Sequence, residues 1–432
     1  MASEPLAAVL QVPPRRFRPY PKYKDSGVEW LGDIPTHWEV KRLKRICTFA
    51  YGESLASPDR TDGDVEVLGS NGQVGTNDHA NTLGPCLVIG RKGSFGKINY
   101  SPKPVFAIDT TFYIDSRFTE EDLRWLYYAL TDARLDASSK DSAIPGLDRE
   151  DAYTRDLLWC SREEQFAIAT FLDRETAKID ALVGKKERVI ELLQEKRAAL
   201  ITQAVARGLD PSVSMKDSGV EWLGVVPAHW DVAPVYSRYV VELGKMLDAK
   251  RVTGEHLAPY IRNVDVQWDR VNVQSLPEMD FEPIERPRYS LRAGDLVVCE
   301  GGEVGRTAIW RGELDECFYQ EAIHRVRPVS TRDEPRFFFY MMHSAAKRGV
   351  FVAGGNPNTI DHLTAIQLQH YRFAFPPRKE QEEVSGLLDT ESARIDDLVR
   401  KIEDGIARLK EFRTALISAA VTGKIDVREE SA

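Results

Sequence analysis

Two long stretches of the chain place apolar residues at alternating steps of four and three, from residue 172 to 204 and from residue 388 to 420. This spacing is the seam of a left-handed coiled coil, with Lys, Arg and Glu on the flanking positions. Each helix has about 45 residues and a length of about 65–70 Å, so it needs a partner to bury its seam. The predicted seam residues are Ile179, Val183, Ile190, Leu193 and Leu200 in the first helix, and Ile395, Val399, Ile402, Ile406, Leu409 and Leu416 in the second.

An internal repeat accounts for this pairing. The letters KDSGVEWLG occupy residues 24–32 and again residues 216–224, followed by IPTHW in the first copy and VPAHW in the second. Each copy continues into a segment of its own sequence and then into a long helix that begins with Glu-Gln. A repeat of this kind implies pseudo-two-fold symmetry, so we expect the two long helices to pack antiparallel within the chain.

We call the repeated motif at residues 24–38 and 216–230 the frame. The segments between each frame and its long helix, residues 39–162 and 231–378, have the pattern of mixed α/β domains. Short β-type runs such as VEVLG and DLVVCE alternate with turn-rich stretches, and helices are predicted near residues 120–130 and 335–346. Both segments carry a strand followed by a Gly-x-x-Gly turn and a cation, IGRKGSFGK at 89–97 and VCEGGEVGR at 298–306. The predicted fold is α+β, with two α/β domains separated by two long antiparallel coiled-coil helices.

Composition narrows the class of protein. The chain has 432 residues, is 42% hydrophobic and 29% charged, and can therefore bury a core. No apolar run approaches the roughly 20 residues that a membrane helix needs, and the amino terminus lacks the pattern of a secretion signal. Five scattered cysteines without a CxxC pair fit a reducing compartment, so we expect a cytoplasmic protein without membrane partners.

Catalytic motifs are missing from the sequence. It has no GxxxxGK[ST] phosphate loop, no glycine-rich cofactor loop paired with an NPPF- or DPPY-type motif, and no cluster of histidines with metal-ligand spacing. A stand-alone DNA methyltransferase or nuclease is therefore disfavoured. We predict a chain that is not itself an enzyme, with no catalytic residues, no metal site and no cofactor of its own.

Several polar positions are candidates for contact with nucleic acid, although the net charge of −9 confines such contacts to local patches. Glycines at 90, 93 and 96 would let a backbone approach a phosphate, but a tight turn with a solvated basic tip explains them equally well. An Asn-Pro turn at 356–359 has side chains that suit adenine, or that bond only locally. The candidate DNA-binding residues are Lys44, Arg45, Arg91, Lys92, Ser94, Lys97, Arg306, Asn356, Asn358 and Thr359.

Taken together, the repeated DSGVEWLG frame, the Glu-Gln start of each long helix and the two Gly-x-x-Gly elements resemble the DNA-specificity subunit of type I restriction–modification systems. The resemblance extends from about residue 24 to 426. It implies one target-recognition domain in each half, reading one half of a split asymmetric sequence in double-stranded DNA, and antiparallel helices as the spacer. It also implies a scaffold for two modification (methyltransferase) subunits and up to two restriction subunits, which would carry S-adenosylmethionine, ATP and Mg²⁺. A structural coiled-coil adaptor with degenerate recognition domains is the remaining alternative.

The resemblance divides the chain into segments. The expected order is a flexible basic arm (1–23), a first recognition domain (24–162), a first spacer helix (163–208), a linker with the second frame (209–230), a second recognition domain (231–378), a second spacer helix (379–426) and a tail (427–432).

Overall fold

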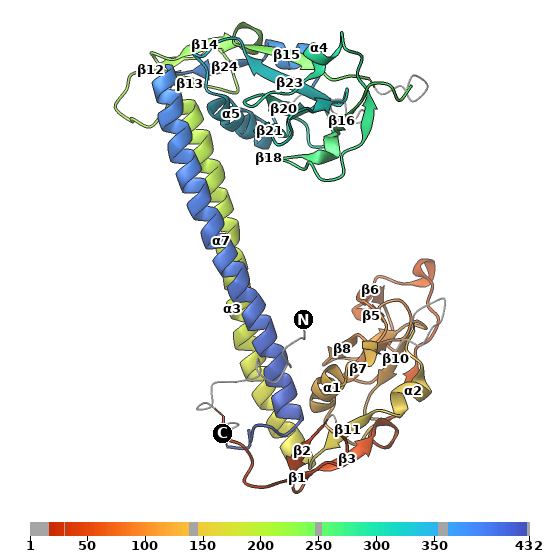
Figure 1. The fold of residues 1–432 in the computed structure, drawn as a ribbon. Coiled ribbons are helices and arrows are strands. Elements are labelled where there is room, and N and C mark those ends of the chain that lie inside the picture. Colours follow the sequence, from red (N-terminus) through yellow and green to blue (C-terminus); the bar gives the residue numbers. More distant parts are fainter. Residues whose placement is uncertain (1–16, 30, 138–145, 247–252, 353–361, 430–432) are drawn as a thin grey trace. The chain divides into compact units, whose positions relative to one another are not determined.

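The computed structural model describes residues 17–29, 31–137, 146–246, 253–352 and 362–429 (Figure 1). The chain divides into two compact units. The first unit comprises residues 1–187 and 403–432, and the second unit comprises residues 188–402. Each unit therefore holds one copy of the frame, one α/β segment and part of each long helix, because the last part of the chain returns to the first.

The first unit begins with a hairpin and closes its α/β segment with a distant strand pair. The hairpin joins β1 (Tyr23–Asp25) to β2 (Asp33–Pro35), and β3 (Glu39–Arg42) pairs with β11 (Asp156–Trp159) across the whole segment. Between these lie two sheets, with strand orders β4-β10-β7-β8 and β6-β5-β9. Their strands are β4 (Ala50–Tyr51), β5 (Val65–Gly69), β6 (Gly72–Asn77), β7 (Cys86–Gly90), β8 (Ile98–Ser101), β9 (Phe106–Ala107) and β10 (Thr111–Ile114).

The second unit has the same plan. Its hairpin joins β12 (Met215–Asp217) to β13 (Val225–Pro227), and β14 (Asp231–Pro234) pairs with β24 (Arg372–Phe375). Its sheets have the orders β15-β23-β20-β21 and β19-β16-β22, with a further small pair, β17-β18. These strands are β15 (Tyr239–Leu243), β16 (Leu257–Ile261), β17 (Val266–Gln267), β18 (Arg270–Val271), β19 (Glu278–Asp280), β20 (Leu296–Cys299), β21 (Thr307–Ile309), β22 (Phe318–Tyr319) and β23 (Ile323–Pro328).

The four-stranded and three-stranded sheets of the two units correspond, whereas the β17-β18 pair belongs to the second unit alone among the described residues. In each unit, the three-stranded sheet contains one parallel pair, β5 with β9 and β16 with β22. In each, a glycine lets the first strand of the four-stranded sheet pass close to a neighbouring backbone. A Cβ on Gly52 would lie 2.0 Å from the carbonyl oxygen of Ile108, and one on Gly244 would lie 2.2 Å from that of Gln320. No larger residue fits either position without displacing a strand.

Short helices cover the sheets. The first unit has α1 (Leu123–Asp132) and α2 (Arg149–Tyr153), and the second has α4 (Arg286–Tyr289), α5 (Pro335–Lys347) and α6 (Ala365–His370). The apolar face of α1 is buried against β7 and β8, and that of α5 packs on β21. The helices predicted near 120–130 and 335–346 are confirmed as α1 and α5.

The Glu-Gln motif links each long helix to its α/β segment. Gln165 and Gln381 are completely buried near the starts of α3 (Arg162–Arg207) and α7 (Arg378–Val421). The side-chain oxygen of Gln165 accepts a hydrogen bond from the amide of Asp122 at 3.0 Å, and that of Gln381 accepts one from the amide of Glu334 at 2.7 Å. Asp122 and Glu334 are the N-cap residues of α1 and α5, so the same contact recurs in both units.

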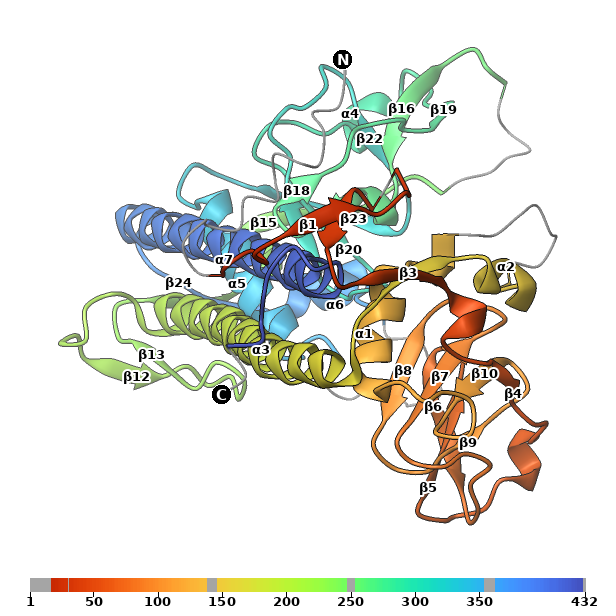
Figure 2. The same cartoon turned by 90° about the horizontal axis from the view of Figure 1, so that it is seen from below.

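Reciprocal ion pairs join α3 to α7. In the first unit, Arg413 pairs with Asp180 at 3.0 Å, and in the second unit Arg197 pairs with Asp396. Within the first unit, Asp180 pairs with Arg413, and Lys186 Nζ lies 3.2 Å from where a Cβ on Gly405 would be, so the segments of α3 and α7 in this unit run antiparallel. They lie side by side in both views (Figure 1 and Figure 2). Such an exchange of equivalent partners is what a pseudo-two-fold repeat predicts.

The expectation of a flexible arm over residues 1–23 is wrong for residues 17–23. Tyr20 is only 3% exposed, and its hydroxyl donates to Glu164 at 2.6 Å. Burial, and then the hydrogen bond to Glu164, raises the pKa of Tyr20. The backbone at Arg18 pairs with Asp426, and the Arg18 side chain pairs with Glu429 at 3.3 Å. The segment is ordered because the end of the chain lies against it, which the linear sequence does not reveal.

Candidate nucleic-acid interface

The turn after β7 presents the candidate basic residues of the first unit. Gly93 and Gly96 have φ angles of +73° and +75°, and the amide of Gly96 donates to the carbonyl of Gly90 at 2.8 Å. These left-handed positions favour glycine and make the turn tight. Lys92 and Ser94 project from it and are exposed. The turn therefore offers a basic, solvent-accessible tip, as both the DNA-binding and the purely structural interpretations require.

In both units, the cation that ends this turn donates hydrogen bonds to an asparagine. Lys97 Nζ donates to the carbonyl oxygen of Asn71 at 2.7 Å and to its side-chain oxygen at 3.0 Å. Arg306 Nη2 donates to the corresponding oxygens of Asn263 at 2.9 and 2.8 Å. The Arg306 side chain is only 14% exposed. Both cations thus tie the end of the turn to the neighbouring sheet, and Arg306 has little surface left for a ligand.

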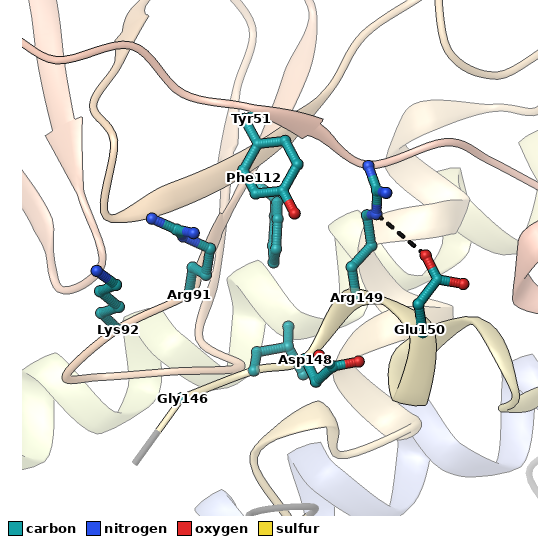
Figure 3. Close-up of a pocket in the computed structure, with 9 residues that line it drawn as sticks. Tyr51, Arg91, Lys92, Phe112, Gly146, Asp148, Arg149 and Glu150 are labelled. Atoms are coloured by element: carbon teal, nitrogen blue, oxygen red, sulfur yellow. Dashed lines mark ion pairs between the residues drawn. The ribbon is translucent and has the colours of Figure 1, made fainter. Parts of the chain in front are cut away.

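A pocket of about 410 Å³ lies beside the basic turn of the first unit (Figure 3). Tyr51 of β4 and Phe112 of β10 supply its aromatic wall, with Tyr51 half exposed and Phe112 buried. Arg91 and Lys92 line it from the turn, and Arg149 lines it from α2. Three segments that are far apart in sequence therefore bring three cations and an exposed aromatic ring to one place.

Lys44 and Arg45 lie apart from this pocket in sequence, in a single 3-10 turn over Leu43–Arg45 that follows β3. Leu43 is completely buried and fixes the turn, which leaves both cations exposed. At the turn of the second unit that corresponds to residues 90–97, Glu300 replaces Arg91 and Gly301 replaces Lys92. Glu303 replaces Ser94 and pairs with Lys347 at 2.7 Å. The remaining candidates, Asn356, Asn358 and Thr359, lie outside the described residues.

Every predicted seam residue is less exposed than the charged residues that flank it. Five are buried, namely Ile179, Val183, Ile395, Ile406 and Leu416. The others, Ile190, Leu193, Leu200, Val399, Ile402 and Leu409, are half-buried. The burial follows the four-three spacing that the sequence predicts for a helix face packed against a partner.

Groups that would support catalysis are scarce in the described part of the chain. Among residues 17–429, less the gaps given above, no His, Cys, Asp and Glu side chains gather into a cluster able to hold a metal ion. All five cysteines are free and buried, and burial raises the pKa of the thiols, to about 12 for Cys317. A thiol with a raised pKa is a poor nucleophile. None of the described helices is long and apolar enough to cross a membrane.

Sequence analysis missed two residues of the pocket, Tyr51 and Arg149. Neither stands in a motif, and they are 98 positions apart in numbering (from 51 to 149), so only the fold brings them together. A weak signal was present in the internal repeat: Tyr51 precedes Gly52, and its counterpart before Gly244 is Leu243. An exposed tyrosine at a position where the other copy has an aliphatic residue points to a property of one half alone.

Comparisons with known proteins agree with this geometry. The family model described as the type I restriction modification DNA specificity domain matches residues 35–192. The EcoBI specificity subunit of Escherichia coli is 19% identical over 349 residues, which cover 78% of this chain and 73% of that relative. The MjaVIII specificity subunit of Methanocaldococcus jannaschii is 20% identical over 426 residues, 91% of this chain and 94% of that relative.

The fold is also similar to a solved structure. A chain from a structural study of complex assembly and conformational transition in a type I restriction–modification system superimposes with a TM-score of 0.62. The two chains are 15% identical, and the superposition covers 98% of that chain and 90% of this chain.

Residues 35–192 thus match the type I restriction modification DNA specificity domain, and the relatives that the chain is similar to over most of its length are type I specificity subunits. The solved structure shows that the fold is shared with a chain of a type I restriction–modification system.

Proposed function

We propose that each unit contributes one target-recognition domain, that each domain reads one half of a split, asymmetric sequence in double-stranded DNA, and that α3 and α7 form the antiparallel coiled-coil spacer between them. The domains correspond to residues 24–162 and 231–378, and the spacer to residues 163–208 and 379–426. The observation that carries this proposal is the correspondence of the four-stranded and three-stranded sheets in two α/β segments whose exposed turns differ in charge. Two copies of one scaffold with different surfaces suit two different half-sites.

The chain itself is proposed to be non-catalytic and to act as a scaffold. Two modification subunits and up to two restriction subunits would assemble on it in the cytoplasm, and these partners would carry S-adenosylmethionine, ATP and Mg²⁺. Two equivalent frames, at residues 24–38 and 216–230, support a symmetric arrangement of partners, because equivalent surfaces bind equivalent subunits. Neither a stand-alone methyltransferase or nuclease nor an adaptor with degenerate domains is supported by the comparisons.

In the first domain, the proposed DNA contacts are the half-buried Arg91 and the exposed residues Lys92, Ser94, Lys44 and Arg45. Lys97 and Arg306 are assigned to the support of their turns, because each donates two hydrogen bonds to an asparagine of its own unit. For Asn356, Asn358 and Thr359 the role in base contact remains the sequence-based expectation. Net charge near neutrality in the second segment makes its affinity depend on base contacts and partner subunits.

A domain exchange tests this proposal. Residues 39–162 are replaced by the matching segment of another type I specificity subunit, and modified sites are mapped in DNA from cells that also express the modification subunits. One half of the modified sequence should change while the other half and the gap stay the same. A control exchange of residues 231–378 should change only the opposite half. A change in both halves after either exchange would show that the domains do not read independently.

A further inference from the structure

The pocket beside the basic turn of the first unit places two of its three cations beside one aromatic ring (Figure 3). The guanidinium carbons of Arg91 and Arg149 lie 5.3 and 5.1 Å from the centre of the Tyr51 ring. Arg91 Nη2 also donates to the carbonyl of Asp109 at 2.7 Å. Stacking uses the face of a guanidinium group and leaves N–H donors at its edge, so a stacked arginine is prepared to bind an oxyanion.

The pocket also contains acidic side chains, which decide how strongly it attracts an anion. Asp148 is the N-cap of α2 and accepts a hydrogen bond from the amide of Asp151, at 2.9 Å. Glu150 pairs with Arg149 at a long 3.5 Å and is 75% exposed. The lining therefore has three cations against two carboxylates. One carboxylate is engaged with the backbone, and the other makes a loose, solvated pair of the kind that contributes little and exchanges readily.

The equivalent place in the second unit can be located by strand register. Tyr51 pairs with Phe112 across β4 and β10, and Leu243 pairs with His324 across β15 and β23. His324 is completely buried and its ring contacts the carbonyl of Leu363 at 2.6 Å. The exposed aromatic ring of the first unit is thus replaced by an aliphatic side chain, and the ring beneath it by a histidine engaged with the backbone.

The cations have no counterparts there either. The amide of Leu147 donates to the carbonyl of Arg91 at 2.9 Å, and the amide of Leu363 donates to that of Glu300 at 2.8 Å, which aligns the two turns. The helices α2 and α6 begin two residues after Leu147 and Leu363. At the positions of Tyr51, Arg91, Lys92 and Arg149, the second unit therefore has Leu243, Glu300, Gly301 and Ala365.

We infer that this pocket of the first unit binds a phosphodiester group of the DNA backbone, and that the corresponding described residues of the second unit make no such contact. The inference rests on the proposed function. Lys92 and the guanidinium edges of Arg91 and Arg149 bind the phosphate oxygens, and the exposed face of Tyr51 packs against the adjoining deoxyribose. Contacts to phosphate position a protein on DNA without reading sequence. This phosphate contact would therefore orient the first domain on the duplex, so that its other residues can contact the bases.

The test uses the complete complex with its modification subunits and two substitutions that spare the hydrogen bond of Arg91. The variant K92Q/R149Q is compared with R174Q/K178Q, which removes two cations paired with Glu175 on α3. Affinity is measured for cognate and scrambled duplexes between 50 and 200 mM salt. For K92Q/R149Q, binding to both duplexes should weaken, the specificity ratio should stay constant, and the slope of log K against log salt should become shallower by about 0.9, because both cations serve one phosphate. Across this fourfold change in salt, its affinity deficit should shrink about 3.5-fold. The control should keep the wild-type slope.

A second variant, Tyr51→Leu, keeps every charge and copies the second unit. It should weaken binding to both duplexes alike, because the two arginines lose the ring that positions them. Unchanged affinity and slope in both variants would overturn the inference. Equally, binding of millimolar inorganic phosphate to wild type but not to K92Q/R149Q, with DNA affinity unchanged at constant ionic strength, would overturn it in favour of a small-anion site. If the wild-type complex binds cognate and scrambled DNA equally, the proposed function itself fails, which is a separate result.

Discussion

Replacing Gly52 with alanine should damage recognition of one half of the DNA target and leave the other half intact. A Cβ at this position would lie 2.0 Å from the carbonyl oxygen of Ile108 and 2.7 Å from that of Ala107. Ordinary contacts of a Cβ start near 3.4 Å. The backbones at Gly52 and Ile108 must therefore separate by roughly 1.4 Å, which would lengthen or break the 3.0 Å hydrogen bond from the amide of Glu53 to the carbonyl of Ala107. Overpacking costs about 1–3 kcal/mol and a lost hydrogen bond about 1 kcal/mol, so the first α/β segment should lose about 2–4 kcal/mol.

Two assays separate a local effect from a global one. Hydrogen exchange resolved by segment should show faster exchange at residues 50–53 and 107–111, and mapping of modified DNA should show relaxed sequence preference in one half-site. Gly244→Ala, whose Cβ would lie 2.2 Å from the carbonyl of Gln320, should relax the other half-site. Gly386→Ala, on α7, serves as a neutral control, because a Cβ at this position would have no atom within 4 Å. Unchanged exchange around residue 52, or equal loss in both halves, would refute the reasoning.

The remaining predictions concern the helices and one buried histidine. Asp180→Arg and Arg413→Asp should each lower stability slightly and the double exchange should restore it, with a coupling of about 0.2–1 kcal/mol in a urea double-mutant cycle; no coupling would argue against this antiparallel register. Burial, and then the charge of Lys347, lowers the pKa of His343 to about 4. The stabilisation from the neutral ring is therefore complete above pH 6.5, and the free energy of unfolding falls by about 2 kcal/mol by pH 5, because only the unfolded state binds the proton there. His343→Phe should remove this acid sensitivity, and equal pH dependence in both proteins would contradict it. Adding seven residues at matched points of α3 and α7 lengthens each by about 10 Å and should widen the unspecified gap in the modified sequence without changing either half; altered half-sites would count against the spacer role.

Periodicity made the long helices predictable from sequence. A four-three spacing over so many turns fixes both the helix and its buried face, and α3 and α7 begin within one residue of the expected starts at 163 and 379. The repeated letters likewise predicted two similar α/β segments, and the helices α1 and α5 followed from local pattern. These features depend on neighbours a few residues away, which a sequence displays directly.

Features that depend on distant contacts could not be predicted in this way. Strands of two residues such as β4 and β9 have too few positions for a pattern, and Gly52 alone allows the backbone after β4 to approach Ala107 and Ile108 so closely. Tyr20 seemed part of a flexible arm because its partner Glu164 is far away in sequence. Arg306 matched a DNA-binding pattern, yet its side chain is taken up by Asn263, which is visible only in three dimensions.

The central claim is that this chain selects a split DNA target. The most direct measurement is to map modified bases across the genome of cells that carry the modification subunits, with this chain present and with its gene deleted. The account predicts an asymmetric motif of two specified halves around an unspecified gap, modified only when the chain is present. Modification of one continuous motif, or a pattern that does not depend on the chain, would contradict it.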